Sequence, residues 1–149
     1  MVSHPLIAPP SRDAAAYGHW SSDHIRYSDL DAVGHANNNA IGVIFEHARV
    51  HMLRDMGIAQ DGGNPLCVLA NLNLEFLAEL KLFDKLRIGQ HVARIGNTSF
   101  TLQSALFVNR GEAEICAATC QTVIVVVDGE QHRPFPIPDH ARSILQKHS

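Results

Sequence analysis

The feature that most limits the fold of this chain is a change of hydrophobic period part-way along it. Between about residues 39 and 56, apolar side chains recur every three or four positions, which is typical of a helix with one apolar face. This stripe consists of Ile41, Ile44, Phe45, Ala48, Met52 and Met56. Gly57 then provides a natural end for the helix. From residue 66 onward the period becomes two, as in β-strands.

Several consecutive strands are expected after the helix. The segment 66–77 alternates most strictly, with one face formed by Leu66, Val68, Ala70, Leu72, Leu74 and Phe76 and the other by Cys67, Asn71, Asn73 and Glu75. Turn residues at 96–97 and 110–111 separate further strands over 85–95, 99–109 and 112–128. A short strand over 20–29 precedes the helix, and a Pro-rich segment leads to a final short helix capped by Asp139.

This order of elements predicts an α+β fold in one domain. The 149 residues provide one sizeable core and no room for a second. An antiparallel sheet of about five strands buries the helix stripe best by curling around it. Residues 1–18 carry three prolines without periodicity, so we expect a loosely ordered arm there and a single domain over 19–149. An edge strand or the far face of the sheet remains available for a second copy.

Composition excludes several classes of protein. No apolar run reaches the roughly 18 residues of a membrane span, and the start of the chain does not resemble a secretory signal, so we expect a cytoplasmic protein. A net charge of -3 without a basic block argues against a nucleic-acid partner. Three cysteines without a CxxC pair indicate neither a disulfide framework nor a zinc site. The charged fraction of 18% is below the usual value of about 25%, which favours a homo-oligomer.

The densest group of polar residues lies where the chain enters the long helix. It comprises Tyr27, Asp29, Asp31, Gly34, His35, Asn37, Asn38 and Asn39. The three asparagines are ordinary helix-capping residues, and Asp29 is suited to holding the turn through backbone N–H groups. Asp31 lies too far before the helix to cap it. A carboxylate facing a helix N-terminus suits acyl transfer, because the free N–H groups can hold an oxyanion while the carboxylate attacks or activates water.

The stretch RYSDLDAVGHANNNAIGVIFEHAR resembles the opening motif of hotdog-fold acyl-CoA thioesterases of the 4-hydroxybenzoyl-CoA thioesterase family. The segments FLAELKLFDKLRIG, IGNTSFTLQSAL and RPFPIP are similar to that family's later strands and ending, so the resemblance covers about residues 20–147. It implies that Asp31 is the catalytic carboxylate and that the backbone N–H of Asn38 polarises the thioester carbonyl. His35 would share the catalytic pocket, with Gly34, Asn37 and Tyr27 as substrate-binding or shaping residues. Many relatives have Tyr or His in place of Asn38.

The resemblance also implies an acyl-CoA or aroyl-CoA substrate, no cofactor, and a homodimer or homotetramer. The acyl group would lie beside the apolar helix face, against residues such as Phe76 or Leu69. Exposed arginines are candidates for holding the CoA phosphates: Arg87, Arg94, Arg110 and Arg133. Two alternatives stay open, a non-catalytic acyl-CoA-binding protein and a hotdog enoyl-CoA hydratase.

Two histidines of the helix raise the question of a metal site. His47 and His51 are four residues apart and share a helix face, but two ligands do not make a site. The acid precedes the first histidine, so the pattern is not HExxH. We therefore expect no metal. Glu46 and Arg49 are instead expected to form a pair on the helix surface or across a subunit contact.

Overall fold

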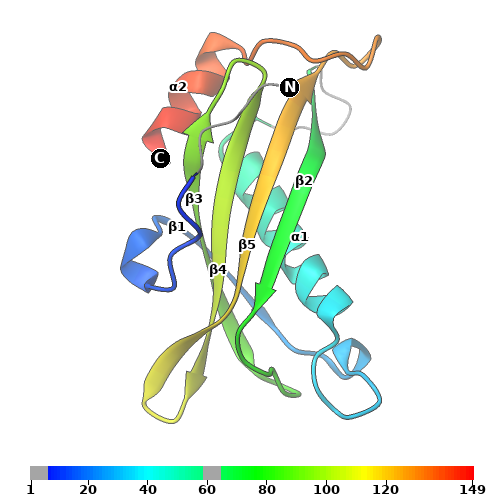
Figure 1. Cartoon of the computed structure of the whole chain (residues 1–149), viewed down its shortest axis with the longest axis vertical. Helices are drawn as coiled ribbons and strands as arrows, with labels where there is room; N and C mark the ends of the chain where they lie inside the picture. The colour runs from blue at the N-terminus through cyan, green and yellow to red at the C-terminus, as the bar shows by residue number, and fades with distance from the viewer. Residues whose placement is uncertain (1–6, 59–64) are drawn as a thin grey trace.

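The computed structural model describes residues 7–58 and 65–149 and confirms the expected order of elements (Figure 1). Strand β1 (His19–His24) precedes helix α1 (Asn38–Asp55). The later elements are β2 (Leu66–Phe76), β3 (Lys85–Ile95), β4 (Ser99–Arg110), β5 (Ala113–Val127) and α2 (Asp139–Lys147). Two short 3₁₀ turns, η1 (Ala14–Ala16) and η2 (Tyr27–Asp29), flank β1.

The five strands form one antiparallel sheet in the order β1-β3-β4-β5-β2, so β1 and β2 are its edges. Helix α1 lies behind the sheet in Figure 1, and α2 lies at the opposite end from the start of α1. This is the α+β hotdog architecture that the resemblance implied. Within the described residues, neither helix is long and apolar enough to cross a lipid bilayer.

The apolar stripe of α1 fills the space between helix and sheet. All six residues expected from the periodicity are buried. The first half of the helix packs against the sheet around Leu86 of β3 and Leu106 of β4. The second half packs with Phe100 of β4 and with Leu145 of α2. Full burial of one such side chain is worth about 1.5–3 kcal/mol, so this stripe fixes α1 against the sheet.

Three details of the expected elements are wrong. The first strand ends at His24 rather than 29, because the Arg26 N–H donates to the Asp29 carboxylate and turns the chain into η2. The alternation of β2 is broken by a register shift between Leu69 and Asn71, so Cys67 rather than Val68 joins the helix-side core. Helix α2 starts after Pro138, and Asp139 lies in its first turn instead of capping it.

The outer face of the sheet carries the N-terminal segment, where we expected a loosely ordered arm. Tyr17 is buried there against Phe107 and Trp20. Gly89 makes this close approach possible, because an added Cβ would lie 2.7 Å from that of Tyr17. The amide of Gln103 also donates to the carbonyl of Ala8 at 2.6 Å. Residues 7–18 therefore cover part of this face, whereas residues 1–6 lie outside the described residues.

Candidate active site at the N-terminus of α1

The loop between η2 and α1 is closed on itself around Asp31. The Asp31 Oδ1 atom accepts hydrogen bonds from the N–H groups of Val33 (2.9 Å) and His35 (3.2 Å). The Asp31 N–H in turn donates to the carbonyl of His35 at 2.8 Å. Gly34, at φ +83°, adopts a left-handed conformation that favours glycine and lets the chain reverse there. Both carboxylate bonds use Oδ1, so a catalytic role would fall to Oδ2.

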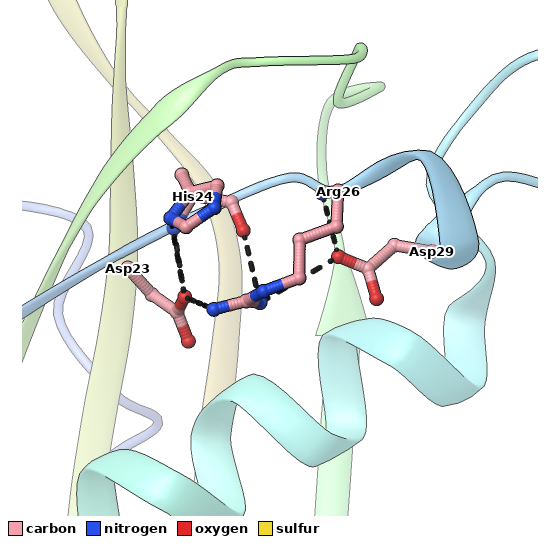
Figure 2. A network of polar contacts seen from close by, with 4 residues as sticks. All are labelled: Asp23, His24, Arg26 and Asp29. Carbon is pink, nitrogen blue, oxygen red and sulfur yellow. Dashed lines mark hydrogen bonds and ion pairs between the residues drawn. The ribbon is translucent and has the colours of Figure 1, made fainter.

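A second network ties the end of β1 to η2, which leads into this loop, as Figure 2 shows. The Arg26 guanidinium lies between two carboxylates, at 2.8 Å from Asp23 and 3.8 Å from Asp29. Asp29 also accepts the Arg26 N–H at 2.8 Å, and its carbonyl accepts the N–H of Asn37 at 2.7 Å. The structure therefore gives Asp29 the turn-holding contacts expected of it, and these contacts connect β1 to the first turn of α1.

The start of α1 is capped by one asparagine side chain. Asn37 is the N-cap, and its Oδ1 accepts the N–H of Asn39 at 2.8 Å. Asn38 is the first helical residue, so its N–H has no acceptor within the helix. This N–H also lies at the positive end of the helix dipole. The capping role among the three asparagines thus belongs to Asn37, and a backbone donor is placed at Asn38.

A pocket of about 350 Å³ brings the three expected catalytic residues together. It is lined by Asp31, His35, Ala36, Asn38, Ile41, Phe76, Leu77, Ala78, Glu79 and Leu80. Tyr27, Gly34 and Asn37 are not among these residues. Tyr27 is 81% exposed on η2, while Gly34 and Asn37 shape the loop and the cap. Of the two residues expected beside the acyl group, Phe76 lines the pocket and Leu69 does not.

Glu79 is a residue of this pocket that the sequence did not single out. Its Oε2 lies 3.2 Å from Nε2 of His35. The neighbouring Leu80 carbonyl accepts the N–H of Ala36 at 2.9 Å, so the β2–β3 connection is joined to the Asp31 loop at two points. Figure 1 shows this connection and the start of α1 at the same end of the molecule. No local pattern marks Glu79, because its partner lies far away in the sequence.

The connection that carries Glu79 is braced from the sheet by an arginine. Arg110 donates to both carboxylate oxygens of Asp84, at 3.0 and 2.8 Å, and to the carbonyl of Glu79 at 2.9 Å. Burial raises the pKa of Asp84, but the hydrogen bonds from Arg110 and from the Lys81 N–H outweigh it and lower that pKa overall. The backbone at Glu79 is therefore held by Arg110 as well as by the neighbouring contact of Leu80 with Ala36.

A second pocket, of about 340 Å³, lies on the β1 side of α1. Its lining includes His19, Ser21, His47, His51 and Asp55, and Nε2 of His19 lies 3.0 Å from the Asp55 carboxylate. His19 Nδ1 and Ser21 Oγ are buried without a hydrogen-bond partner in the part of the chain that the structure describes. Among those residues, no three His, Cys, Asp or Glu side chains are grouped as a metal site requires.

Arg87 and Arg110, both suggested for CoA, are each held by a carboxylate of this chain. Arg87 binds Glu114 through two hydrogen bonds of 2.9 and 2.8 Å and stacks on Trp20. The hydrogen bonds between Arg87 and Glu114 raise the pKa of the arginine and lower that of the glutamate. Arg110 is bound to Asp84 as described above. The expected pair of Glu46 and Arg49 on α1 is present at 4.0 Å.

Comparison with known proteins extends over most of the chain. The crystal structure of the PA5185 protein from Pseudomonas aeruginosa superposes with a TM-score of 0.83 and 26% identity, covering 95% of this chain and 96% of that one. A structure described as a predicted thioesterase from Bacillus stearothermophilus gives 0.78 and 25%, covering 87% and 94%. The uncharacterized protein YsmA of Bacillus subtilis is 25% identical over 121 residues, which is 81% of this chain and 80% of that protein. The family model described as "Thioesterase-like superfamily" matches residues 25–145. The chain therefore belongs to the thioesterase-like superfamily.

Proposed function

We propose that this protein hydrolyses an acyl-CoA or aroyl-CoA thioester to the free acid and CoA. One observation carries the proposal: the carboxylate of Asp31 and the N-terminus of α1 line the same pocket. Membership of the thioesterase-like superfamily supports the same reaction class. Acyl transfer needs a group that attacks or activates water and a group that stabilises the oxyanion, and this pocket contains both.

The start of α1 serves as the oxyanion hole in this mechanism. Asn38 is the first helical residue and lines the pocket, and its free N–H acts together with the helix dipole on the thioester carbonyl. One such donor contributes about 3–4 kcal/mol to transition-state stabilisation. Asn37 keeps the first turn in place, and Gly34 allows the loop to bring Asp31 to it.

Asp31 acts as nucleophile or as general base. The bonds to Oδ1 hold the carboxylate in one orientation, which leaves Oδ2 to attack the carbonyl carbon or to accept a proton from water. The apolar part of the pocket, which includes Ile41 and Phe76, receives the acyl group. Tyr27, on η2 beside this loop, is proposed to contact the exposed part of the substrate.

We also propose that the protein works as a homodimer or a homotetramer. Edge strand β2 presents apolar side chains to solvent, including Leu69 and Leu72, and the outer face of α1 adds Val43 and Val50. An unpaired strand edge with exposed apolar residues suits a second copy. Replacing Leu72 with lysine should shift the oligomer to monomer in light scattering coupled to size exclusion. If this variant has the same molar mass as the wild-type oligomer, the β2 edge is not the subunit interface.

The test of the activity uses matched carboxylate variants and a panel of acyl-CoA chain lengths and benzoyl-CoA. Asp31→Asn should lower kcat/KM at least about a hundredfold, because it removes the nucleophile or base. Asp55→Asn, which removes a carboxylate from the other pocket, should leave kcat/KM within about twofold. Wild-type activity retained by Asp31→Asn would reject the assignment.

Two further measurements separate the remaining alternatives. Single turnover in ¹⁸O-labelled water, with enzyme in excess, places the label in Asp31 when the carboxylate attacks and water then cleaves the mixed anhydride at the Asp31 carbonyl carbon. Trapping of the acyl-enzyme detects the same anhydride when water attacks its acyl carbon, and a general base gives neither signal. Binding of acyl-CoA without turnover across the panel would favour the non-catalytic alternative. Addition of water to crotonyl-CoA would favour a hydratase.

A further inference from the structure

We propose that His35 donates the proton to the departing CoA thiolate and that Glu79 is the positioning residue that orients its imidazole. This inference rests on the proposed thioesterase function and assigns the part of the reaction that Asp31 and Asn38 leave open. It starts from the contact between His35 Nε2 and Glu79 Oε2 at 3.2 Å, which joins two walls of one pocket.

The backbone of His35 is held on both sides. Its N–H donates to the Asp31 carboxylate and its carbonyl accepts the Asp31 N–H. The next residue, Ala36, is buried and donates its N–H to Leu80. Gly34 supplies the turn immediately before it. The Cα of His35 is thereby fixed relative to the carboxylate that we propose as catalytic.

The side chain of His35 is oriented by the opposite wall. The Glu79 carboxylate lies 3.2 Å from Nε2, and a carboxylate only accepts hydrogen bonds, so its charge favours the imidazole form with a hydrogen on Nε2 and leaves Nδ1 to serve the pocket. The backbone of Glu79 is held, because Arg110 binds its carbonyl and is itself bound by Asp84, while the 69% exposed side chain reaches His35 from this fixed point. A histidine whose far nitrogen is held by a carboxylate is the arrangement that fixes an imidazole for proton transfer.

The charged groups that face His35 in the pocket are both carboxylates. They are Asp31 on the same loop and Glu79 on the β2–β3 connection, and among the described residues no basic side chain other than His35 lines this pocket. The side chain of His35 is 37% exposed, so solvent reaches the imidazole.

The proposed step conserves atoms and charge. When the tetrahedral intermediate collapses, the C–S bond breaks and its electron pair goes to sulfur. The proton on Nδ1 of the His35 imidazolium passes to that sulfur, so CoA leaves as the thiol and the imidazole becomes neutral. The hydrogen on Nε2 stays there, facing the Glu79 carboxylate, and Nδ1 regains a proton from solvent. The step is the same whether Asp31 or an activated water attacked the carbonyl.

The experiment compares leaving groups. The acyl group that the wild type hydrolyses fastest in the acyl-CoA panel is presented both as its CoA thioester and as its thioester with 2-nitro-5-thiobenzoic acid, whose thiol is far more acidic. A thiolate that is already a good leaving group does not need a proton donor. His35→Gln should therefore lower kcat at least about tenfold on the CoA ester and less than about threefold on the activated ester.

Glu79 variants show whether the acid acts through the histidine. Glu79→Gln should give the same selective loss on the CoA ester at a smaller size, in kcat rather than in KM, and Glu79→Asp should recover part of it. Glu75→Gln is the matched control, because Glu75 is also an exposed glutamate in an ion pair, with Arg12. Its activity on both esters should stay within about twofold of the wild type.

Each result supports or overturns the inference. Equal losses on the two esters for His35→Gln would show a structural role and overturn it, as would a His35→Gln enzyme with unchanged activity on both; in these cases the wild type still hydrolyses thioesters and the proposed function stands. A wild type that hydrolyses neither ester would reject the proposed function and the inference with it. Circular dichroism melting curves for every variant separate loss of folding from loss of chemistry.

Discussion

Helix α1 is flanked by two polar pockets of nearly equal size, and each contains a histidine paired with a carboxylate. On the β1 side His19 lies 3.0 Å from Asp55, and at the helix start His35 lies 3.2 Å from Glu79. The volumes are about 340 and 350 Å³. A histidine–carboxylate pair in a pocket is therefore not sufficient evidence for an active site in this molecule.

The pockets differ in what surrounds the pair. The β1-side pocket is bordered by the middle and end of α1, from Ile44 to Asp55, where the backbone N–H groups are used within the helix. The other pocket contains the start of the helix and a second carboxylate, Asp31, held by backbone N–H groups. Of these two pockets, the one at the start of α1 offers an attacking group and an oxyanion donor together, and this difference directs the proposed activity to it.

The largest effect should come from removing the backbone donor at Asn38. Proline is tolerated at the first position of a helix, and Asn37 before it already has the extended conformation that proline requires (φ -65°, ψ 142°). Asn38→Pro should therefore keep α1 intact but lower kcat by about 10²–10³-fold, while Asn38→Ala keeps the N–H and most of the activity. Steady-state kinetics with melting curves measure both. Equal activities of the two variants would place the oxyanion donor elsewhere.

The next effect separates the pockets through two matched isoleucines of α1. Ile41 lines the candidate active site and Ile44 lines the β1-side pocket, and both are buried. Replacing either with alanine should lower the free energy of unfolding by about 2–5 kcal/mol, because each leaves a cavity in the same core. Only Ile41→Ala should shift the preferred acyl group toward larger ones in the acyl-CoA panel. A similar shift in Ile44→Ala would mean that the acyl group enters from the β1 side.

The helix stripe to which these two isoleucines belong is one of the features that the sequence alone predicts. The helix stripe and the succession of helix and strands along the chain follow from hydrophobic period, because burial of one face is enforced along the whole element. The loop with Asp31, Gly34 and His35 follows from local turn and cap chemistry, which acts over a few residues. Such patterns placed both the core and the centre of the candidate site.

What the sequence did not reveal depends on contacts between distant segments. The approach of Glu79 to His35 depends on how the β2–β3 connection crosses the start of α1, and no periodicity encodes it. The bulge after Leu69 has no turn residue to mark it, so the alternation seemed continuous. The end of β1 was misplaced because Ile25 and Tyr27 alternate like strand residues, although the Asp29 carboxylate turns the backbone there.

A smaller effect is expected from breaking the histidine–carboxylate pair on the β1 side. His19 is mostly buried whereas Asp55 is largely exposed, so their bond joins β1 to the last turn of α1 at modest gain. Asp55→Asn and His19→Gln should each lower the free energy of unfolding by about 1 kcal/mol in urea titrations, with kcat/KM within about twofold. A large loss of activity without loss of stability would make the β1-side pocket part of the reaction and remove the distinction between the two.

The smallest effect concerns acid stability on the candidate-site side, where the Asp84–Arg110 pair braces the connection carrying Glu79. The pKa of Asp84 is lower in the folded chain than its ordinary value of about 3.9. Such a group stabilises the fold above its unfolded pKa, and this contribution is lost as the pH falls through the lower folded pKa. Between pH 7 and pH 3, urea titrations should show a larger loss of unfolding free energy for the wild type than for Asp84→Asn. Arg110→Gln should likewise show a smaller loss of unfolding free energy than the wild type between pH 7 and pH 3, since it deletes the partner that lowers the pKa of Asp84. Equal pH dependence in all three proteins would show that the brace contributes no acid-sensitive stability.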